Sequence, residues 1–92
     1  MFKTPWFDNS MIQSEEGFSV RWGRDWAVYR EGKRQVTLTI DVGGSGANIF
    51  VGSGARWDDD PSESIDLDTQ MRIIDNVRRA LEWKGFHVLL VD

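Results

Sequence analysis

The sequence predicts an α+β domain in which a mainly antiparallel, five-stranded sheet carries one long helix across one face. Two patterns indicate this fold class. Residues 17–51 alternate between apolar and polar side chains and are interrupted by glycine-containing turns, which is typical of a meander of strands. Residues 66–84 instead repeat their apolar side chains with the period of an amphipathic helix. One such helix and one two-sided sheet bury their apolar sides against each other.

The whole chain, residues 1–92, is expected to form a single domain, because its length lies near the lower end for folding on one hydrophobic core. Apolar residues make up 40% of the chain, and five Trp and five Phe concentrate that content in large rings. The absence of cysteine excludes disulfides and thiolate metal sites. The net charge of −4 disfavours nucleic acid as a partner and makes a basic protein a more natural target.

The N-terminal segment lacks the apolar core of a signal peptide, and no apolar run approaches the roughly 20 residues that a spanning helix needs. We therefore expect a soluble, cytoplasmic protein without a membrane partner. Residues 1–16 contain Phe2, Trp6 and Phe7 without a clear period, and Pro5 argues against a helix there. We expect an irregular arm whose aromatic side chains dock on the body of the domain more often than they meet a partner.

Four strands are expected within residues 17–51, at residues 18–22, 26–31, 35–42 and 47–51. The third alternates most cleanly, with Val36, Leu38 and Ile40 on one face and threonines between them. That face is expected to be buried under the helix while the other looks to water. A fifth strand is expected at residues 86–91. Its nearly continuous apolar side chains indicate a strand covered on both faces or lying inside the sheet, and chain direction favours a place beside residues 18–22, antiparallel to them.

The expected helix, residues 66–84, gathers its apolar side chains on one side at about 100° per residue. Asp66 or Asp68 is placed to cap its first turn, and Gly85 to adopt the left-handed conformation that ends the last turn. Trp83 falls on the polar side, where the N-terminal arm is expected to cover it. The apolar side consists of Leu67, Ile73, Ile74, Val77, Ala80 and Leu81, with Met71 at its edge.

Three short motifs resemble sites of chemistry, and each has a simpler structural interpretation. Gly43 to Gly46 (GGSG) resembles a phosphate-binding loop, but no Lys-Ser/Thr pair and no helix follow it, which favours a hairpin turn. The acids Asp58 to Asp60 are consecutive and precede Pro61, a spacing that does not fit a calcium loop. His87 is the only histidine, and it stands in an apolar strand, so no histidine-based dyad or metal cluster is possible. We expect no enzyme activity, no cofactor and no bound metal.

The loop of residues 52–65 is longer than a hairpin connection and unusually acidic. Acids that flank a large aromatic side chain on a long loop suit a surface that docks onto a basic partner. Because such a loop is expected to be exposed, reversing the charges of residues 58–60 should barely affect folding. The candidate partner-binding residues are Trp57, Asp58, Asp59, Asp60, Glu63 and Asp66.

Four segments together resemble a known family: RWDDDP at residues 56–61, IDL at 65–67, RIIDNVRRAL at 72–81 and KGF at 84–86. Over about residues 17–92 the chain is similar to small immunity proteins of bacterial polymorphic-toxin and contact-dependent growth-inhibition systems. The resemblance implies a protein that binds one cognate toxin domain in the cytoplasm of the producing cell. It would neutralise the toxin by covering its active site or substrate surface, and many such toxins are nucleases with basic clefts. Partners vary within the family, so it implies no individual contact residue.

Two other functions stay open on the residues alone. The first is a small, non-catalytic subunit or accessory domain of a protein assembly, which would use Trp83 and the aromatic side chains of the arm as an apolar contact. The second is a single-stranded nucleic-acid binder, because aromatic rings among basic residues stack on bases. Its candidate residues are Arg21, Arg24, Arg30, Lys33 and Arg34 around Trp22, Trp26 and Tyr29. The oligomeric state is not indicated by the sequence.

Overall fold

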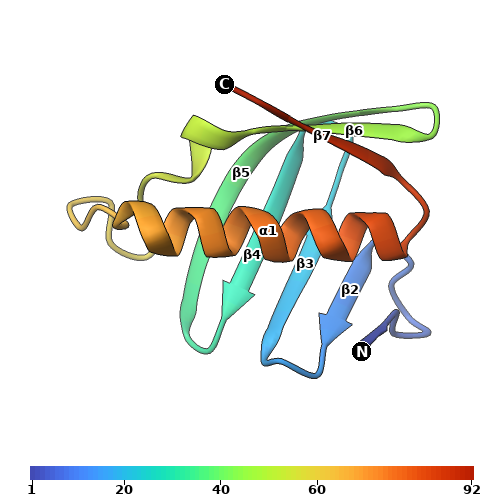
Figure 1. Ribbon diagram of the computed structural model, residues 1–92. Helices are drawn as coiled ribbons and strands as arrows, with labels where there is room; N and C mark the ends of the chain where they lie inside the picture. Colours follow the sequence, from blue (N-terminus) through green and yellow to red (C-terminus); the bar gives the residue numbers. More distant parts are fainter.

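The computed structural model describes residues 1–92 as a sheet of seven strands with one long helix across one face (Figure 1). The predicted α+β class is confirmed, although the sheet has more strands than the five predicted. A short 3₁₀ turn, η1, forms the start of the acidic loop of residues 52–65. The elements are β1 (Phe2–Lys3), β2 (Met11–Ser14), β3 (Phe18–Trp22), β4 (Trp26–Glu31), β5 (Arg34–Gly43), β6 (Gly46–Phe50), η1 (Val51–Gly54), α1 (Leu67–Trp83) and β7 (His87–Val91).

The strands lie in the sheet in the same order as in the chain, from β1 to β7. Every neighbouring pair is antiparallel except β6 and β7, which run parallel with Ala47 opposite Val88. The predicted place of the last strand, antiparallel beside residues 18–22, is wrong because β2 already occupies that side of β3. The long connection through α1 is the kind of crossover that joins parallel neighbours.

The N-terminal segment is more regular than the predicted arm. β2 pairs with β3 through Ile12 opposite Val20, and β1 pairs with β2 through Phe2 opposite Ser14. Ile12 is fully buried, so this segment joins the sheet because it adds apolar area to the core. Only residues 4–10, between the two strands, are irregular.

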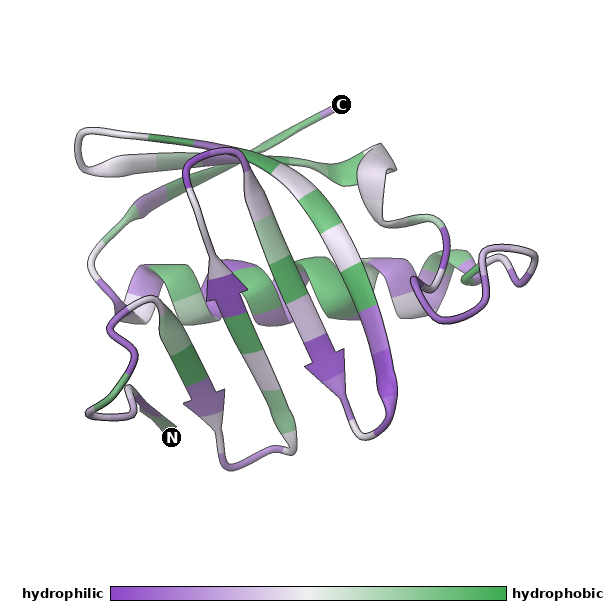
Figure 2. Ribbon diagram, turned by 180° about the vertical axis from the view of Figure 1, so that it is seen from behind, coloured by the Kyte–Doolittle hydropathy of each residue, from purple (hydrophilic) through white to green (hydrophobic).

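The core lies between the sheet and the helix, as the two apolar patterns predict. Val36, Leu38 and Ile40 of β5 are at most 1% exposed, and Val77 and Leu81 of α1 are fully buried. All five side chains belong to one cluster of buried residues. Figure 2 shows the strand side of this pattern, with apolar and polar bands alternating along the central strands.

The sheet changes direction at β5. Residues 34–39 of this strand pair with β4, whereas residues 40–43 pair with β6. In Figure 1, β6 and β7 consequently run along the upper side of the helix while β2 to β5 cross behind it. The first part of β5 therefore has no strand on the side opposite β4, and the acidic loop takes that position.

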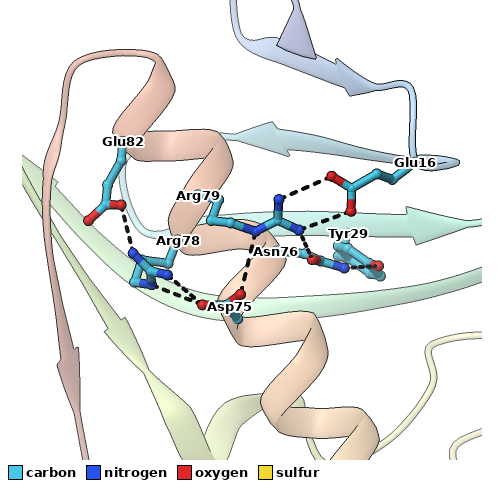
Figure 3. A network of polar contacts seen from close by, with 7 residues as sticks. All are labelled: Glu16, Tyr29, Asp75, Asn76, Arg78, Arg79 and Glu82. Carbon is cyan, nitrogen blue, oxygen red and sulfur yellow. Dashed lines mark hydrogen bonds and ion pairs between the residues drawn. The ribbon is translucent and has the colours of Figure 1, made fainter. Parts of the chain in front are cut away.

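One flank of α1 is joined to the sheet by polar contacts (Figure 3). Asn76 is only 7% exposed and donates a hydrogen bond from Nδ2 to the Tyr29 hydroxyl at 3.0 Å. Arg79 binds the carboxylate of Glu16, which lies in the turn between β2 and β3, at 3.1 Å. Burial and the hydrogen bond to Glu31 raise the pKa of Tyr29 to about 12.

The other two arginines of the helix, Arg72 and Arg78, have different partners. Arg72 forms an ion pair with Glu31 on the flank that carries Asn76, and this contact holds the pKa of Glu31 below its usual value. On the outer side of the helix, Arg78 is held by Asp75 and Glu82, so its charge is balanced within the helix (Figure 3). The ion pair of Arg72 therefore joins the helix to the sheet, whereas the ion pairs of Arg78 stay within the helix.

The helix begins and ends close to the predicted residues. Asp66 occupies the N-cap position without a side-chain hydrogen bond, and Gly85 follows the helix with a φ of +106°. Leu67 and Met71 were assigned to its apolar side and edge, but they are 69% and 50% exposed. They lie beyond the flank that the sheet covers. The helix is not long and apolar enough to cross a membrane.

β7 is less covered than the sequence predicts. It pairs with β6 on one side and with no strand on the other, so it forms an edge of the sheet. Val88 is 9% exposed, but Leu89 and Leu90 are 55% and 47% exposed. The interpretation of residues 86–91 as a strand covered on both faces is therefore wrong, since an apolar run is compatible with either position.

Candidate functional site

The acidic loop seals the side of β5 that has no neighbouring strand. The Asp58 backbone N–H donates to the Gln35 carbonyl at 2.7 Å, and the Asp58 carboxylate accepts from the Thr37 N–H and hydroxyl at 3.1 and 2.6 Å. Farther along the strand, the Ser53 hydroxyl accepts from the Thr39 N–H at 2.9 Å. These contacts satisfy strand groups that would otherwise lack partners. These contacts argue against the expectation that charge reversal at Asp58 barely affects folding.

Trp57 lies beneath the loop rather than on it. Its side chain is 8% exposed and belongs to the core cluster. The guanidinium carbon of Arg34 stands 4.4 Å from the centroid of the ring, in cation–π geometry. The sequence suggested an exposed aromatic contact beside the acids, but this ring instead anchors the loop to the domain.

Arg34 links the buried ring to the acids above it. Its guanidinium makes two hydrogen bonds to the Glu63 carboxylate, at 2.6 and 3.2 Å, and its Nε lies 3.6 Å from an oxygen of Asp59. The hydrogen bond to Glu63 raises the pKa of Arg34. Asp59 and Glu63 nevertheless remain about half exposed, at 48% and 49% of their side chains. Their carboxylates therefore have fixed positions and still face solvent.

The last two predicted residues also keep their charges at the surface. Asp60 accepts hydrogen bonds from the Ser62 hydroxyl and N–H, at 2.6 and 3.2 Å, and these bonds lower its pKa. Asp66 is exposed at the N-cap of α1 and makes no side-chain cap hydrogen bond. The ledge formed by residues 55–66, here called the acidic ledge, thus presents several carboxylates from a fixed backbone. An antiparallel bridge between Arg56 and Ser64 closes its base.

The other motifs have structural positions. Gly43 and Gly46 pair at the end of the β5–β6 hairpin, and Gly44 has a φ of +59°, so the predicted hairpin turn is confirmed. The His87 side chain is exposed, while its backbone N–H donates to the Ser45 carbonyl at 2.8 Å. No group of three or more His, Asp or Glu side chains comes together in a way that could hold a metal ion.

Sequence reasoning left two exposed aromatic side chains out of the candidate site. Trp6 is 96% exposed and Phe7 is 66% exposed, and their ring centroids are 5.9 Å apart. Phe2 alone of the arm's aromatic side chains docks near the helix, 6.0 Å from the ring of Trp83. Trp83 remains 44% exposed, so the expected cover is partial. The turn formers on both sides of residues 6–7 were the available signal that this pair lies at the tip of a loop.

Only part of the basic and aromatic set considered for nucleic-acid binding lies on one face, where Arg21, Trp26 and Arg30 line one hollow. Tyr29 is fully buried and Trp22 packs with Phe86, at 5.9 Å between ring centroids. Arg21 is paired with Asp8 at 2.6 Å. Trp26 keeps 38% of its surface on the open face of the sheet. The stack of exposed rings between basic side chains that such binding requires is not assembled in this structure.

A search of protein-family models, curated proteins and solved structures finds no match to this chain. The resemblance of residues 17–92 to immunity proteins therefore stays a prediction from the sequence.

Proposed function

We propose that this chain is an immunity protein that binds a cognate bacterial toxin domain and neutralises it in the cytoplasm of the producing cell. The acidic ledge is the binding surface, and a basic nuclease domain is the partner. The observation that supports this most directly is the fixed display of the carboxylates of Asp59, Asp60 and Glu63 on a backbone anchored by Trp57. The ledge covers the active site or the substrate surface of the toxin.

A fixed ledge is a better inhibitor than a flexible acidic loop with the same residues. Ordering a mobile segment on binding costs conformational entropy, whereas the ledge is already held by Asp58 and Trp57. Its carboxylates take the places of substrate phosphates in a basic cleft. Their charge also steers the encounter, so association is expected to be fast at low salt and slower as salt rises.

The second candidate function is that of a non-catalytic subunit in a larger assembly. The exposed pair Trp6 and Phe7 favours it, because aromatic side chains are enriched among residues that dominate protein interfaces. This pair lies in the β1–β2 loop, near the C-terminal end of α1, whereas the acidic ledge lies at the N-terminal end (Figure 1). Variants of the two surfaces therefore separate the two functions.

The main experiment uses the product of the reading frame that precedes this gene, which the proposed function expects to end in a toxin domain. Co-expression of this chain should restore growth, and titration into the purified toxin reaction should reach full inhibition near one equivalent. Failure to restore growth would contradict the immunity function. Full protection at strongly substoichiometric amounts would instead indicate an enzyme that acts on the toxin or its product.

A charge-neutral variant tests the ledge itself. Asp59→Asn, Asp60→Asn and Glu63→Gln together remove three charges while preserving side-chain size and oxygen acceptors. Association with the toxin at low salt should slow by about tenfold or more, and its dependence on salt should become weaker. Thermal unfolding checks that the variant remains folded.

The matched control removes the same number of charges elsewhere, through Glu15→Gln, Asp25→Asn and Asp41→Asn. These carboxylates lie outside the ledge, and all three residues are exposed. The control should associate at nearly the wild-type rate. Equal slowing in the two variants would mean that net charge alone matters, and no slowing in the ledge variant would place the interface elsewhere.

A further inference from the structure

The two edges of the sheet are protected to different degrees. β1 has only two residues, Phe2–Lys3, includes a charged side chain and is soon followed by Pro5. Short length, lysine and proline are the features that keep a strand edge from pairing with another chain. β7 has five residues, His87–Val91, and contains no Asp, Glu, Lys, Arg or Pro. The edge formed by β7 therefore lacks these protections.

The backbone of β7 has free hydrogen-bonding groups along that edge. His87 donates its N–H to Ser45, on the side of β6. Because successive residues of a strand direct their N–H and C=O groups to opposite sides, Val88 and Leu90 direct theirs away from β6. No strand pairs there. An added strand would form its hydrogen bonds with these two residues.

The geometry of this edge fits a second copy of the same strand. In an antiparallel pair centred on Leu89, Val88 of each copy lies opposite Leu90 of the other. These are the two residues whose backbone groups are free, so each such pair exchanges both of its hydrogen bonds. Leu89 of one copy then lies opposite Leu89 of the other, between the two hydrogen-bonded pairs. A twofold axis that passes between the two Leu89 residues thus gives hydrogen-bond partners to the free backbone groups of Val88 and Leu90 in both copies.

The side chains of the strand are compatible with self-pairing. In a twofold contact a central charged residue faces its own copy, and like charges directly opposite each other are destabilising. β7 has no such charge, although the chain carries a net charge of −4. Leu89 and Leu90, which are 55% and 47% exposed, would both be covered by the second strand.

The flank of α1 on the side of β7 also carries exposed apolar side chains. The flank of α1 that carries Asn76 faces β1 to β4, and at about 100° per residue Met71 and Leu67 lie on the opposite flank. That flank is on the side of β7, but Leu67 and Met71 lie at the N-terminal end of α1, whereas β7 begins beside its C-terminal end (Figure 1). Met71 and Leu67 are 50% and 69% exposed. The nearby charge of Arg78 is balanced within the helix, so the flank opposes a second copy only weakly.

We propose that two copies of this chain associate through β7, in antiparallel register about Leu89, so that one sheet continues through both copies. The helices lie on the same face of that sheet. This inference does not depend on the toxin. A contact of one short strand lies at the small end of specific interfaces, so the dissociation constant is expected on the order of tens of micromolar.

The test is sedimentation equilibrium of the full chain from about 1 µM to about 1 mM, a range that brackets the expected dissociation constant. The wild type should change from monomer to dimer across this range. The amides of Val88 and Leu90 should exchange more slowly with deuterium at the high end than at the low end. A monomer at every concentration would overturn the proposal, including the case in which the two amides become protected only when a toxin domain is added.

Residue 89 provides a test of the register. Leu89→Lys and Leu89→Glu should each remain monomeric at concentrations where the wild type is dimeric, because each places like charges opposite each other. An equimolar mixture of the two variants should form a heterodimer. The matched control is Phe7→Lys, which introduces the same charge at an exposed apolar residue of the β1–β2 loop, outside β7, and should dimerise like the wild type.

Circular dichroism establishes that the variants are folded, which is expected because the Leu89 side chain is more than half exposed. Dimerisation of Leu89→Lys alone would place the interface elsewhere and overturn the proposal. Two monomeric single variants that fail to associate when mixed would overturn the register about Leu89.

Discussion

The two flanks of α1 differ in how they are completed. On the flank toward β1 to β4, Asn76 and Arg79 reach the sheet through hydrogen bonds to Tyr29 and Glu16. On the flank toward β7, apolar side chains such as Met71 are left in solvent. Both flanks belong to the same helix and border the same core. The domain therefore completes one side of its core with internal polar contacts and leaves the other side apolar and open.

The difference shows that amphipathic pattern alone does not determine which side chains are buried. Asn76 is polar and buried because a buried hydroxyl, that of Tyr29, accepts its hydrogen bond. Leu67 is apolar and exposed because no element of this chain covers it. Four predictions test this difference between the two flanks, beginning with the largest expected effect.

Truncation of the helix core should have the largest effect on stability. Leu81→Ala should lower the free energy of unfolding by about 2–5 kcal/mol, because the side chain is fully buried and its loss leaves a cavity. Met71→Ala on the open flank should change it by less than about 0.5 kcal/mol. Urea denaturation measures both. Similar losses for the two variants would mean that the open flank is covered within the monomer.

The protected flank should make stability sensitive to high pH. The pKa of Tyr29 rises from 10.0 to about 12 on folding, so its contribution is fully present below pH 10. As pH rises from 10 toward 12, the unfolded chain ionises this hydroxyl and the folded chain does not, which lowers stability by roughly 2–3 kcal/mol. Tyr29→Phe should lose this part of the pH dependence. An unchanged alkaline profile in that variant would show that Tyr29 is not the titrating group.

Removing the buried amide should have an intermediate effect. Asn76→Ala eliminates the hydrogen bond to Tyr29 and an acceptor for Arg79, and it should lower stability by about 1–3 kcal/mol. Thermal unfolding at neutral pH measures the change. The pKa of the tyrosine should rise further, because the bond from Asn76 lowers it in the native protein. A neutral effect on stability would contradict a structural role for this contact.

The exposed ion pair on the same flank should have the smallest effect. Arg72→Met removes the pairing with Glu31, and the two side chains are 50% and 37% exposed. The stability loss should be about 0.2–1 kcal/mol and should decrease as salt is added, because solvent screens the pair. A larger loss that salt does not alter would show that Arg72 acts through packing.

Local patterns predicted much of the fold. The alternation in residues 18–42 and the period of residues 66–84 each depend on neighbours in the chain, and both gave elements within a few residues of those observed. Strand partners are different, because they are chosen by distant segments. Ile12 joins the sheet through Val20, and β7 lies beside β6, for reasons that no short window of sequence contains.

The candidate site illustrates the same limit with two tryptophans. Trp6 follows a proline and precedes an acid two residues later, while Trp57 precedes three acids and a proline. From the sequence, the arm that carries Trp6 was expected to dock on the domain and Trp57 was expected to contact a partner. The structure exposes Trp6 and buries Trp57, because the β5 edge offers the second ring a place under Arg34. The acids themselves could be found from the sequence, but the structural task of Asp58 could not.

The parallel pairing of β6 and β7 has a consequence for synthesis of the protein. Ala47 cannot pair with Val88 until the whole of α1, which lies between them in the chain, has been synthesised. The strands from β2 to β6 leave the ribosome before the helix does, with Val36 and Leu38 uncovered. Local hairpins form early and distant pairings late, so the nascent chain exposes an apolar sheet until its last strand arrives. Translation products that stop before residue 87 are therefore expected to aggregate rather than to accumulate as smaller folded domains.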